Sequence, residues 1–542
     1  MSVIQQAVTR LLTVTEPDRV FTYPGSPPRY VYKTVADAGI EIETCVREQH
    51  LLHLAQTGYF QGLEDGEEQI PVVIVSADLG EAMLSQPLLA GSISCPCVVI
   101  VAEEAFPHVD NSANIAHQTD RATTHQKVDD REQIRRHENV ADRILVTGEN
   151  DIKAVEEVVE TVREQESVGV IHLPLYAEDE IGTEFESIER YRPSTLTTAQ
   201  FTAVWETAER RLFIVGRGIR QPGARERIAS IAERSGVPIA TTLQTDGYFE
   251  TNHVGRIGTV GTPSANEAFF QADLVVALGT SMNNLLTSYD PDTIETFQSK
   301  TIQVDKNPRR RSVFVESWVP QDVTALLDAV AWGRADPWFE HQYDIGERRE
   351  LVPDPVQTLA DSIRRHCPES VVTLGVGNAM IWMTYALGPQ MRKDVSRSGS
   401  MGEVVSGLSW GETPILVLGD GEFEMDLSLI TEAQHQETSP IICIVNNGRL
   451  GLVTERQESE FGKRLTSKVN SPIDYGRLDH AFNGVESFTP ESPQGIENAF
   501  KAAVETTDVS IIEITTTERL SNEIFDISVL PRVHAESPHR SD

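Results

Sequence analysis

The chain has 542 residues, of which 39% are hydrophobic and 6% aromatic, so it is long and apolar enough for about three globular domains. Its net charge of −36 argues against nucleic acid as a partner, because phosphate binding needs clustered cations. No apolar run is long enough for a membrane helix, and Met1–Gln6 lacks the basic and apolar regions of a signal peptide.

The charge and the cysteines also suggest a compartment. Acidic residues are dispersed along the chain and Lys is rare, a pattern typical of a halophilic cytoplasmic protein. The five cysteines form an odd and sparse set, which predicts a reducing cytoplasm and not a disulfide framework. Cys95-Pro96-Cys97 could serve metal or redox chemistry. Since no second pair follows at zinc spacing, we predict that these cysteines are small buried hydrophobes.

The first domain is predicted over residues 1–185, where helices alternate with continuous apolar strands, as in a buried parallel sheet. We expect the strands at residues 21–23, 40–46, 72–76, 98–102 and 171–175. The first strand stops at Pro24-Gly25, and the second leads to Glu48. The spacing of the apolar residues after it predicts a helix whose buried face holds Leu51, Leu54, Ala55 and Tyr59.

A second α/β domain is predicted over residues 195–335. Its expected strands are residues 212–215, 237–240, 274–279 and 302–305. Gly216-Arg217-Gly218 follows the first of them and could indicate a dinucleotide site. The full glycine fingerprint is missing, so this motif alone is weak evidence.

The third domain is predicted over residues 355–521, followed by a polar tail at 522–542. Its most informative stretch is an apolar strand, the turn Gly419-Asp420-Gly421-Glu422, a helix, a second apolar strand, and Asn447. In a parallel sheet both turns lie at the carboxyl edge, where such folds bind ligands. Each turn could also be an ordinary surface turn, since Asp-Gly and Asn-Gly are common turn pairs.

Together these turns offer a metal and anion site. Asp420 supplies a carboxylate, Asn447 an amide oxygen and Arg449 a backbone carbonyl, and Mg²⁺ is usually held by few protein ligands plus phosphate oxygens. Gly421 and the amides that follow it can donate to an anion.

The combined pattern resembles the thiamine diphosphate (ThDP) motif of the acetolactate synthase, pyruvate oxidase and benzoylformate decarboxylase group. This resemblance extends over nearly the whole chain. It implies an α/β fold of three doubly wound parallel-sheet domains. The first would bind the pyrimidine, the second is the central domain, and the third would bind the diphosphate and Mg²⁺.

The resemblance also implies site residues. Glu48 would hydrogen-bond the pyrimidine ring nitrogen, the Gly399 carbonyl would accept from the pyrimidine amino group, and Met401 would bend the cofactor by lying between its rings. Gln118 resembles a glutamine near the substrate. The further residues expected at the cofactor are Pro24, Gly25, Gly377, Asn378, Ala379, Gly419, Gly421 and Glu422.

The reaction expected from the resemblance is decarboxylation of a small 2-oxo acid followed by acetolactate synthase-like carboligation. Simple decarboxylation, or a non-catalytic binding protein of the same fold, are the alternatives. The arginine that many synthases carry after the Leu278-Gly279 position is missing, which makes FAD binding doubtful, and Arg456 stands where synthases carry a tryptophan. The resemblance implies a homodimer or homotetramer with active sites between subunits.

Overall fold

The structure is a computed structural model, and its description covers most of the chain. The described residues are 3–25, 28–44, 48, 51–65, 69–76, 95–104, 140–146, 151–175, 193–220, 223–258, 260–280, 282, 291–306, 312, 314–339, 349–388, 391–395, 404–405, 407–408, 410–411, 413–466 and 473–520. Among the helices in these ranges, none is both long and apolar enough to cross a bilayer.

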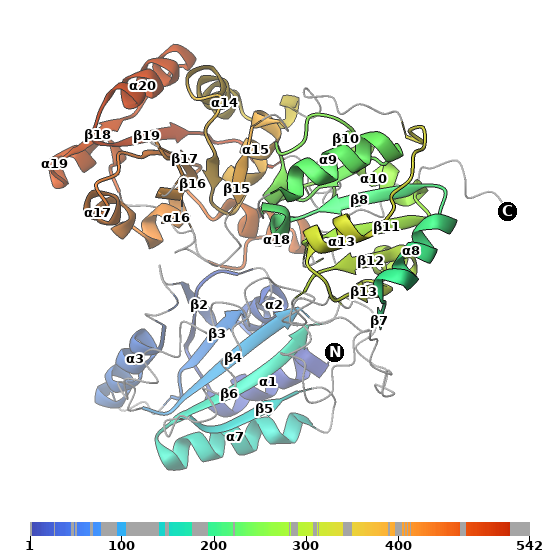
Figure 1. Cartoon of the computed structure of the whole chain (residues 1–542). Coiled ribbons are helices and arrows are strands. Elements are labelled where there is room, and N and C mark those ends of the chain that lie inside the picture. Colours follow the sequence, from blue (N-terminus) through green and yellow to red (C-terminus); the bar gives the residue numbers. More distant parts are fainter. Residues whose placement is uncertain are drawn as a thin grey trace. The chain divides into compact units, whose positions relative to one another are not determined.

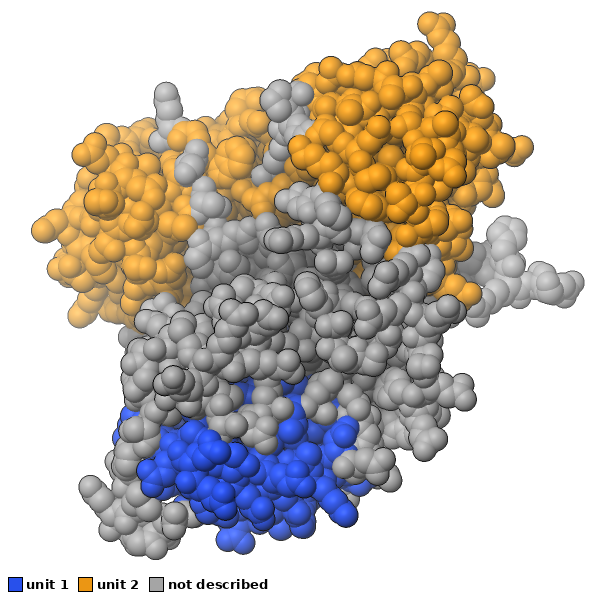
Figure 2. All heavy atoms as spheres, turned by 60° about the horizontal axis from the view of Figure 1, so that its bottom comes forward, with its two compact units in different colours: residues 1–190, 448–471 blue, residues 191–447, 472–542 orange. Residues whose placement is uncertain are grey.

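The chain forms two compact units, coloured separately in Figure 2. Unit 1 comprises residues 1–190 together with residues 448–471, and unit 2 comprises residues 191–447 together with residues 472–542. Unit 1 holds one parallel sheet and unit 2 holds two. The prediction of three parallel-sheet α/β domains is confirmed, whereas the exact domain boundaries stay predictions.

The sheet of unit 1 has the strand order β2-β1-β3-β4-β6-β5. Its strands are β1 (Arg19–Thr22), β2 (Glu41–Thr44), β3 (Val72–Ser76), β4 (Cys97–Glu104), β5 (Val140–Leu145) and β6 (Val168–Leu175). Its helices are α1 (Val3–Thr15), α2 (Arg29–Asp37), α3 (Leu51–Asp65) and α7 (Ile152–Gln165). Helices α1, α2 and α7 pack on one face and α3 on the other, because alternate strand residues point to opposite faces (Figure 1).

Helix α18 (Gly451–Phe461) and the residues after it complete the core of unit 1. Leu465 is buried in the same cluster as residues of α1, α2 and α7. The rings of Phe461 and Tyr30 meet edge to face with centroids 5.7 Å apart. Gln457, almost fully buried, accepts hydrogen bonds from the amides of Leu465 and Thr466. A segment far along the sequence is therefore part of the N-terminal fold.

The central sheet of unit 2 has the order β10-β9-β8-β11-β12-β13-β7. Its strands are β7 (Ser194–Thr195), β8 (Arg211–Val215), β9 (Ile239–Thr241), β10 (His253–Arg256), β11 (Leu274–Leu278), β12 (Thr301–Val304) and β13 (Ser317–Val319). Its helices are α8 (Thr198–Thr207), α9 (Ala224–Ser235), α10 (Pro263–Gln271), α12 (Pro291–Lys300) and α13 (Val323–Ala329), with the 3₁₀ turns η3 (Arg217–Arg220) and η4 (Leu243–Thr245). Helices α8, α9 and α13 bury one face, and α10 and α12 the other.

The third sheet, also in unit 2, has the order β15-β14-β16-β17-β19-β18. Its strands are β14 (Val372–Leu374), β15 (Lys393–Val395), β16 (Ile415–Gly419), β17 (Ile441–Asn446), β18 (Val485–Phe488) and β19 (Val509–Thr515). Its helices are α14 (Asp354–His366), α15 (Asn378–Leu387), α16 (Asp420–Met425), α17 (Ser428–His435), α19 (Leu478–Ala481) and α20 (Pro493–Glu505), with the 3₁₀ turns η6 (Arg349–Leu351) and η8 (Tyr475–Arg477). Helices α16 and α17 cover one face, and α14, α15 and α20 lie on the opposite face (Figure 1).

Two details of the first domain differ from the sequence prediction. Leu54 was expected on the buried face of α3 but is 39% exposed, because the helix buries Leu51, Leu52 and Ala55. Strand β5 was not predicted, since Val140–Leu145 contains Asp142 and Arg143 and does not form an apolar run. The prediction of buried cysteines is confirmed: Cys95 and Cys97 are free thiols in the core, and burial raises the pKa of Cys95 to about 12.

Candidate active site

The carboxyl edge of the third sheet brings together the two turns singled out in the sequence. Strands β14, β16 and β17 are neighbours, and Gly419 at the end of β16 pairs with Val445 near the end of β17. Asp420 directly follows β16, and Asn447 directly follows β17. Because these strands are parallel and in register, both residues lie at one edge of the sheet.

Asp420 and Asn447 are in contact at this edge. The backbone N–H of Asn447 points to Asp420 Oδ1, with a nitrogen–oxygen distance of 3.4 Å, and Asp420 is only 2% exposed. The side-chain amide of the neighbouring Asn446 donates to Glu513 Oε1 at 2.6 Å. That side chain therefore contacts β19. A carboxylate and an amide carbonyl are hard oxygen donors of the kind that Mg²⁺ prefers. Within the described ranges, no group of three or more His, Cys, Asp or Glu is arranged to hold a metal ion.

Arg449, the third predicted metal ligand, lies in unit 1, and the boundary between the units falls between Asn447 and Gly448. The Arg449 guanidinium pairs with Glu455 at 3.2 Å, and Gly448 has a φ of +63° that favours glycine. The role of the Arg449 carbonyl stays a prediction.

The turn between β14 and α15 forms a cradle beside Asp420. Gly377 is the N-cap of α15 and has a φ of +87°, and Asn378 and Ala379 begin the helix. A Cβ added at Gly377 or at Gly419 would meet no described atom within 4 Å, so both glycines face open space. The first amides of a ten-residue helix that face open space are suited to an anion.

Glu422, in α16, contacts the turn between β14 and α15. Its Oε2 accepts from the Val376 amide at 2.8 Å, and a Cβ at Gly375 would lie 1.9 Å from the same oxygen. Burial raises the pKa of Glu422 to about 8, against the effect of the Val376 hydrogen bond. Among the described residues, Oε1 of Glu422 has no hydrogen-bond partner. The sequence suggested Glu422 as a cofactor residue but did not reveal Gly375, whose missing side chain makes room for the carboxyl group.

In unit 1, the turn at Pro24-Gly25 is held by a residue that the sequence did not indicate. The buried Tyr32 hydroxyl accepts from the Gly25 amide at 3.3 Å and donates to the Tyr23 carbonyl at 3.2 Å. It also lies 2.9 Å from Thr22 Oγ1. A tyrosine nine residues after Tyr23 carries no local signal of this contact, because the contact depends on how α2 packs on the sheet.

The remaining predicted residues are placed as follows. Glu48 is half-buried and lies beyond the end of β2. Gln118, Gly399 and Met401 lie outside the described residues, as does the side chain of Arg456.

The glycines after β8 are explained by packing in the central domain. The Gly218 amide donates to the Gly279 carbonyl at 2.8 Å, and a Cβ at Gly218 would lie 2.7 Å from the Cα of Gly279. A Cβ at Gly216 would lie 2.4 Å from the Thr280 Cβ. Two loops meet here backbone to backbone, so these glycines do not require a dinucleotide to account for them.

Comparison with known families finds two matches, one in the central part of the chain and one in its C-terminal part. Residues 199–330 match "Thiamine pyrophosphate enzyme, central domain", and residues 375–514 match "Thiamine pyrophosphate enzyme, C-terminal TPP binding domain". The second match contains Gly377, Asp420 and Asn447.

Curated relatives carry acetolactate synthase names. The chain is 24% identical over 396 residues to the probable acetolactate synthase large subunit of Methanocaldococcus jannaschii, covering 63% of this chain and 66% of the relative. It is 26% identical over 318 residues to the acetolactate synthase of Arthrospira platensis, covering 52% and 54%. It is 24% identical over 524 residues to the large subunit of Corynebacterium glutamicum, covering 87% and 79%. The aligned part thus spans less than two thirds of the length of the first two relatives.

A solved structure is similar in fold. Benzoylformate decarboxylase from Polynucleobacter necessarius superposes with a TM-score of 0.50 at 16% identity, covering 96% of this chain and 100% of that one. At this identity the similarity supports the three-domain fold alone.

Proposed function

The chain belongs to the thiamine diphosphate-dependent enzymes, and from that premise we propose that it uses ThDP and Mg²⁺ to decarboxylate a small 2-oxo acid and to join the remaining fragment to a second carbonyl compound. The names of its curated relatives, which are acetolactate synthases, support this choice of reaction. The observation that carries the proposal is the contact between Asp420 and Asn447 at the sheet edge, beside glycines that face open space.

The chemistry of the described residues fits ThDP and its metal ion. When bound, ThDP supplies a carbanion that attacks the keto carbon of the substrate. Asp420 and Asn447 would hold Mg²⁺ together with diphosphate oxygens, and the amides after Gly377 and Gly419 would donate to the diphosphate. Glu48 would hold a proton at the pyrimidine ring nitrogen, which is the role the family resemblance gives it.

Simple decarboxylation is the alternative. The two reactions differ in whether the fragment left after loss of CO₂ is joined to an acceptor or protonated. Arg456 stands where synthases carry tryptophan, and it could either bind a second carboxylate of the substrate by a charge-assisted contact or be a solvated charge on its helix. A non-catalytic protein of the same fold is less consistent with the retained Glu48, Asp420 and Asn447.

The proposal extends to cofactors and assembly. We expect turnover without FAD, because the flavin arginine is missing and the Gly216–Gly218 turn is accounted for by packing. From the family resemblance we also propose a homodimer or homotetramer. From the net charge of −36 we propose that it is a cytoplasmic protein of a halophile.

Product analysis tests the function. The protein is incubated with ThDP, Mg²⁺ and a panel of 2-oxo acids, and CO₂ release and products are followed by mass spectrometry. Pyruvate, alone or with a second 2-oxo acid, should give an acetohydroxy acid without added FAD. Aldehyde and CO₂ in equal amounts, with no joined product at any acceptor concentration, would replace carboligation by simple decarboxylation. Absence of ThDP binding would refute both.

A further inference from the structure

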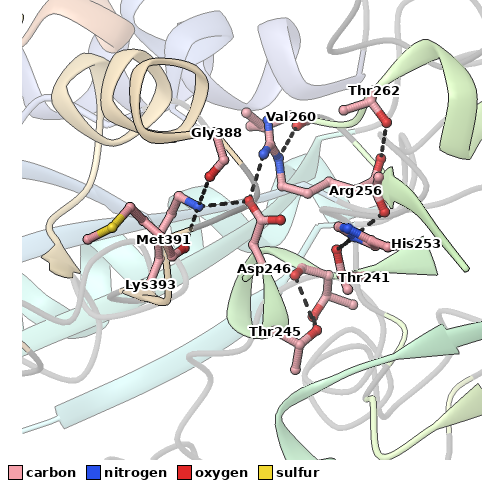
Figure 3. A network of polar contacts seen from close by, with 12 residues as sticks. Thr241, Thr245, Asp246, His253, Arg256, Val260, Thr262, Gly388, Met391 and Lys393 are labelled. Carbon is pink, nitrogen blue, oxygen red and sulfur yellow. Dashed lines mark hydrogen bonds and ion pairs between the residues drawn. The ribbon is translucent and has the colours of Figure 1, made fainter. Parts of the chain in front are cut away.

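Asp246, Arg256 and Lys393 form an ion-pair network inside unit 2 (Figure 3). Asp246 Oδ2 accepts from Arg256 Nη1 at 2.6 Å and from Lys393 Nζ at 3.0 Å, and all three side chains are 0% exposed. Two cations thus share one carboxylate. The network carries an excess positive charge, which its other neighbours must stabilise because burial penalises an unbalanced charge.

The C-terminal end of helix α15 provides this stabilisation. Lys393 Nζ donates to the carbonyl of Gly388, the C-cap of α15, at 2.5 Å and to the carbonyl of Met391 at 2.9 Å. The Arg256 guanidinium lies 5.5 Å from the ring centre of Tyr385, in the last turn of the same helix. Cations are favoured at a helix C-terminus, where unpaired carbonyls carry partial negative charge, and over an aromatic face.

The neighbouring His253 does not change the charge of the network at neutral pH. His253 Nε2 is hydrogen-bonded to Thr241 Oγ1 at 3.0 Å. Mainly because of burial, the pKa of His253 is lowered to about 4, so the ring is neutral. Burial also lowers the pKa of Lys393 to about 8, against the attraction of Asp246. The ammonium group therefore remains mostly charged at pH 7 and depends on its carbonyl contacts.

The network connects two domains. Asp246 follows η4 and Arg256 ends β10, both in the central domain, whereas Lys393 begins β15 in the third sheet. The backbones also approach closely here: a Cβ at Gly247, which has a φ of +80°, would lie 2.5 Å from the Met391 carbonyl oxygen.

Helix α15 has its other end at the candidate diphosphate site, where Gly377 is its N-cap. A ten-residue helix is a stiff body about 15 Å long, so holding one end also fixes the place of the other. β15 pairs with β14, the strand that leads into the same cradle.

We propose that Asp246 and Arg256 are positioning residues of the diphosphate site: through Lys393 and Tyr385 they hold helix α15 at its C-terminal end and thereby fix its N-terminal end. This inference rests on the proposed function, because ThDP diphosphate is the ligand of that site. The central domain thus contributes to cofactor affinity from within the protein interior.

Two lysines that contact helix ends, the buried Lys393 and the half-buried Lys300, test the role. Lys300 Nζ also donates to helix-end carbonyls, those of Phe269, Phe270 and Ala272 at the end of α10, and its pKa is also lowered to about 8. Helix α10 does not begin at the cradle. Lys393→Met and Lys300→Met should both lower the unfolding midpoint. Lys393→Met alone should weaken ThDP binding, by about tenfold at saturating Mg²⁺, as measured by calorimetry on the cofactor-free protein.

Amide hydrogen exchange in the cofactor-free protein gives a second readout. Exchange along α15, including its first turn, should be faster in Lys393→Met than in the parent and unchanged in Lys300→Met. Arg256→Lys keeps the charge but shortens the link from Asp246 to Tyr385. It should lower ThDP affinity in protein that remains folded, and it serves if Lys393→Met does not fold.

The outcomes separate this inference from the proposed function. Equal losses of affinity in Lys393→Met and Lys300→Met, or parental affinity in Lys393→Met or in a folded Arg256→Lys, would overturn the positioning role alone. If the parent chain bound no ThDP in calorimetry, the proposed function would fail and this inference with it.

Discussion

Glu422 shows how a single buried side chain shapes the candidate site. It occupies space that Gly375 leaves empty and accepts from the Val376 amide, so one carboxyl group links the turn after β14 to the turn after β16. A carboxylate buried this deeply is disfavoured, and its pKa rises to about 8. At pH 7 the Glu422 carboxyl group is therefore mainly protonated and uncharged while it contacts the turn after β14.

Replacing Glu422 should alter the pH dependence of stability. The folded pKa of about 8 exceeds the ordinary value of 4.5, so the folded protein binds more protons than the unfolded one between these values. The free energy of unfolding of the parent should therefore fall as pH rises from 4.5 to 8. Glu422→Gln should lack this contribution to the slope, as measured by denaturant unfolding of metal- and cofactor-free protein. Parallel curves for parent and variant would contradict the assignment, and Glu505→Gln, at the exposed end of α20, is the control.

Removing Asp420 should abolish Mg²⁺-dependent ThDP binding. The carboxylate is a hard ligand at the sheet edge, and alanine offers no oxygen in its place. Calorimetry with and without Mg²⁺ on Asp420→Ala checks this, with an unfolding scan in molar KCl to show that the variant is folded. Asp426→Ala, at the C-terminal end of α16, is the control and should bind like the parent. Unchanged ThDP affinity in Asp420→Ala would disprove the metal role.

Local sequence predicts some site residues and misses others for a physical reason. Asp420 and Asn447 could be placed at one edge because each directly follows an apolar strand, and parallel strands end together. Tyr32 could not be predicted, because its hydroxyl acts on a turn through the packing of α2. The link between Asp246 and Lys393 joins residues far apart in sequence and carries no periodic signal.

At the level of elements, apolar runs predicted many of the buried strands, and β5 is an exception with a clear cause. Strands β3, β8 and β11 are buried along nearly their whole length, so their sequences are continuous apolar runs. Strand β5 was not predicted because its charged residues interrupt the apolar run. The assignment of α18 and the residues after it to unit 1 depends on long-range packing that a local pattern does not contain.

The segment after α18 should contribute measurably to the stability of unit 1. Leu465 is 9% exposed and lies in the core cluster, so Leu465→Ala should lower the free energy of unfolding by about 2–4 kcal/mol. Leu427, 36% exposed in unit 2, provides the control, and Leu427→Ala should change it by less than about 0.5 kcal/mol. Denaturant unfolding measures both. Equal small effects would mean that residues 448–471 do not stabilise the fold.

The whole molecule is dominated by its charge. With 82 acidic and 46 basic residues, the chain carries −36 charges. Like charges repel across a compact surface, and this repulsion opposes folding at low salt.

Thermal stability should therefore rise with salt. The unfolding midpoint is expected to increase from about 0.1 M KCl into the molar range, because the Debye length shrinks from about 10 Å to about 3 Å over that range. Differential scanning calorimetry measures this, with sucrose at equal osmolality as the control for excluded-solute effects. A midpoint that is flat or falls with KCl would exclude a halophilic surface.

The discontinuous composition of unit 1 has a consequence for biosynthesis. Ile4 and Leu465 share one buried cluster, although most of the chain separates them. During translation the ribosome makes the whole central domain before Leu465 emerges. At roughly 5–20 residues per second this delay is on the order of tens of seconds. During that time the part of the N-terminal core that Leu465 covers is exposed. A holdase chaperone could bind this apolar surface before the fold is complete.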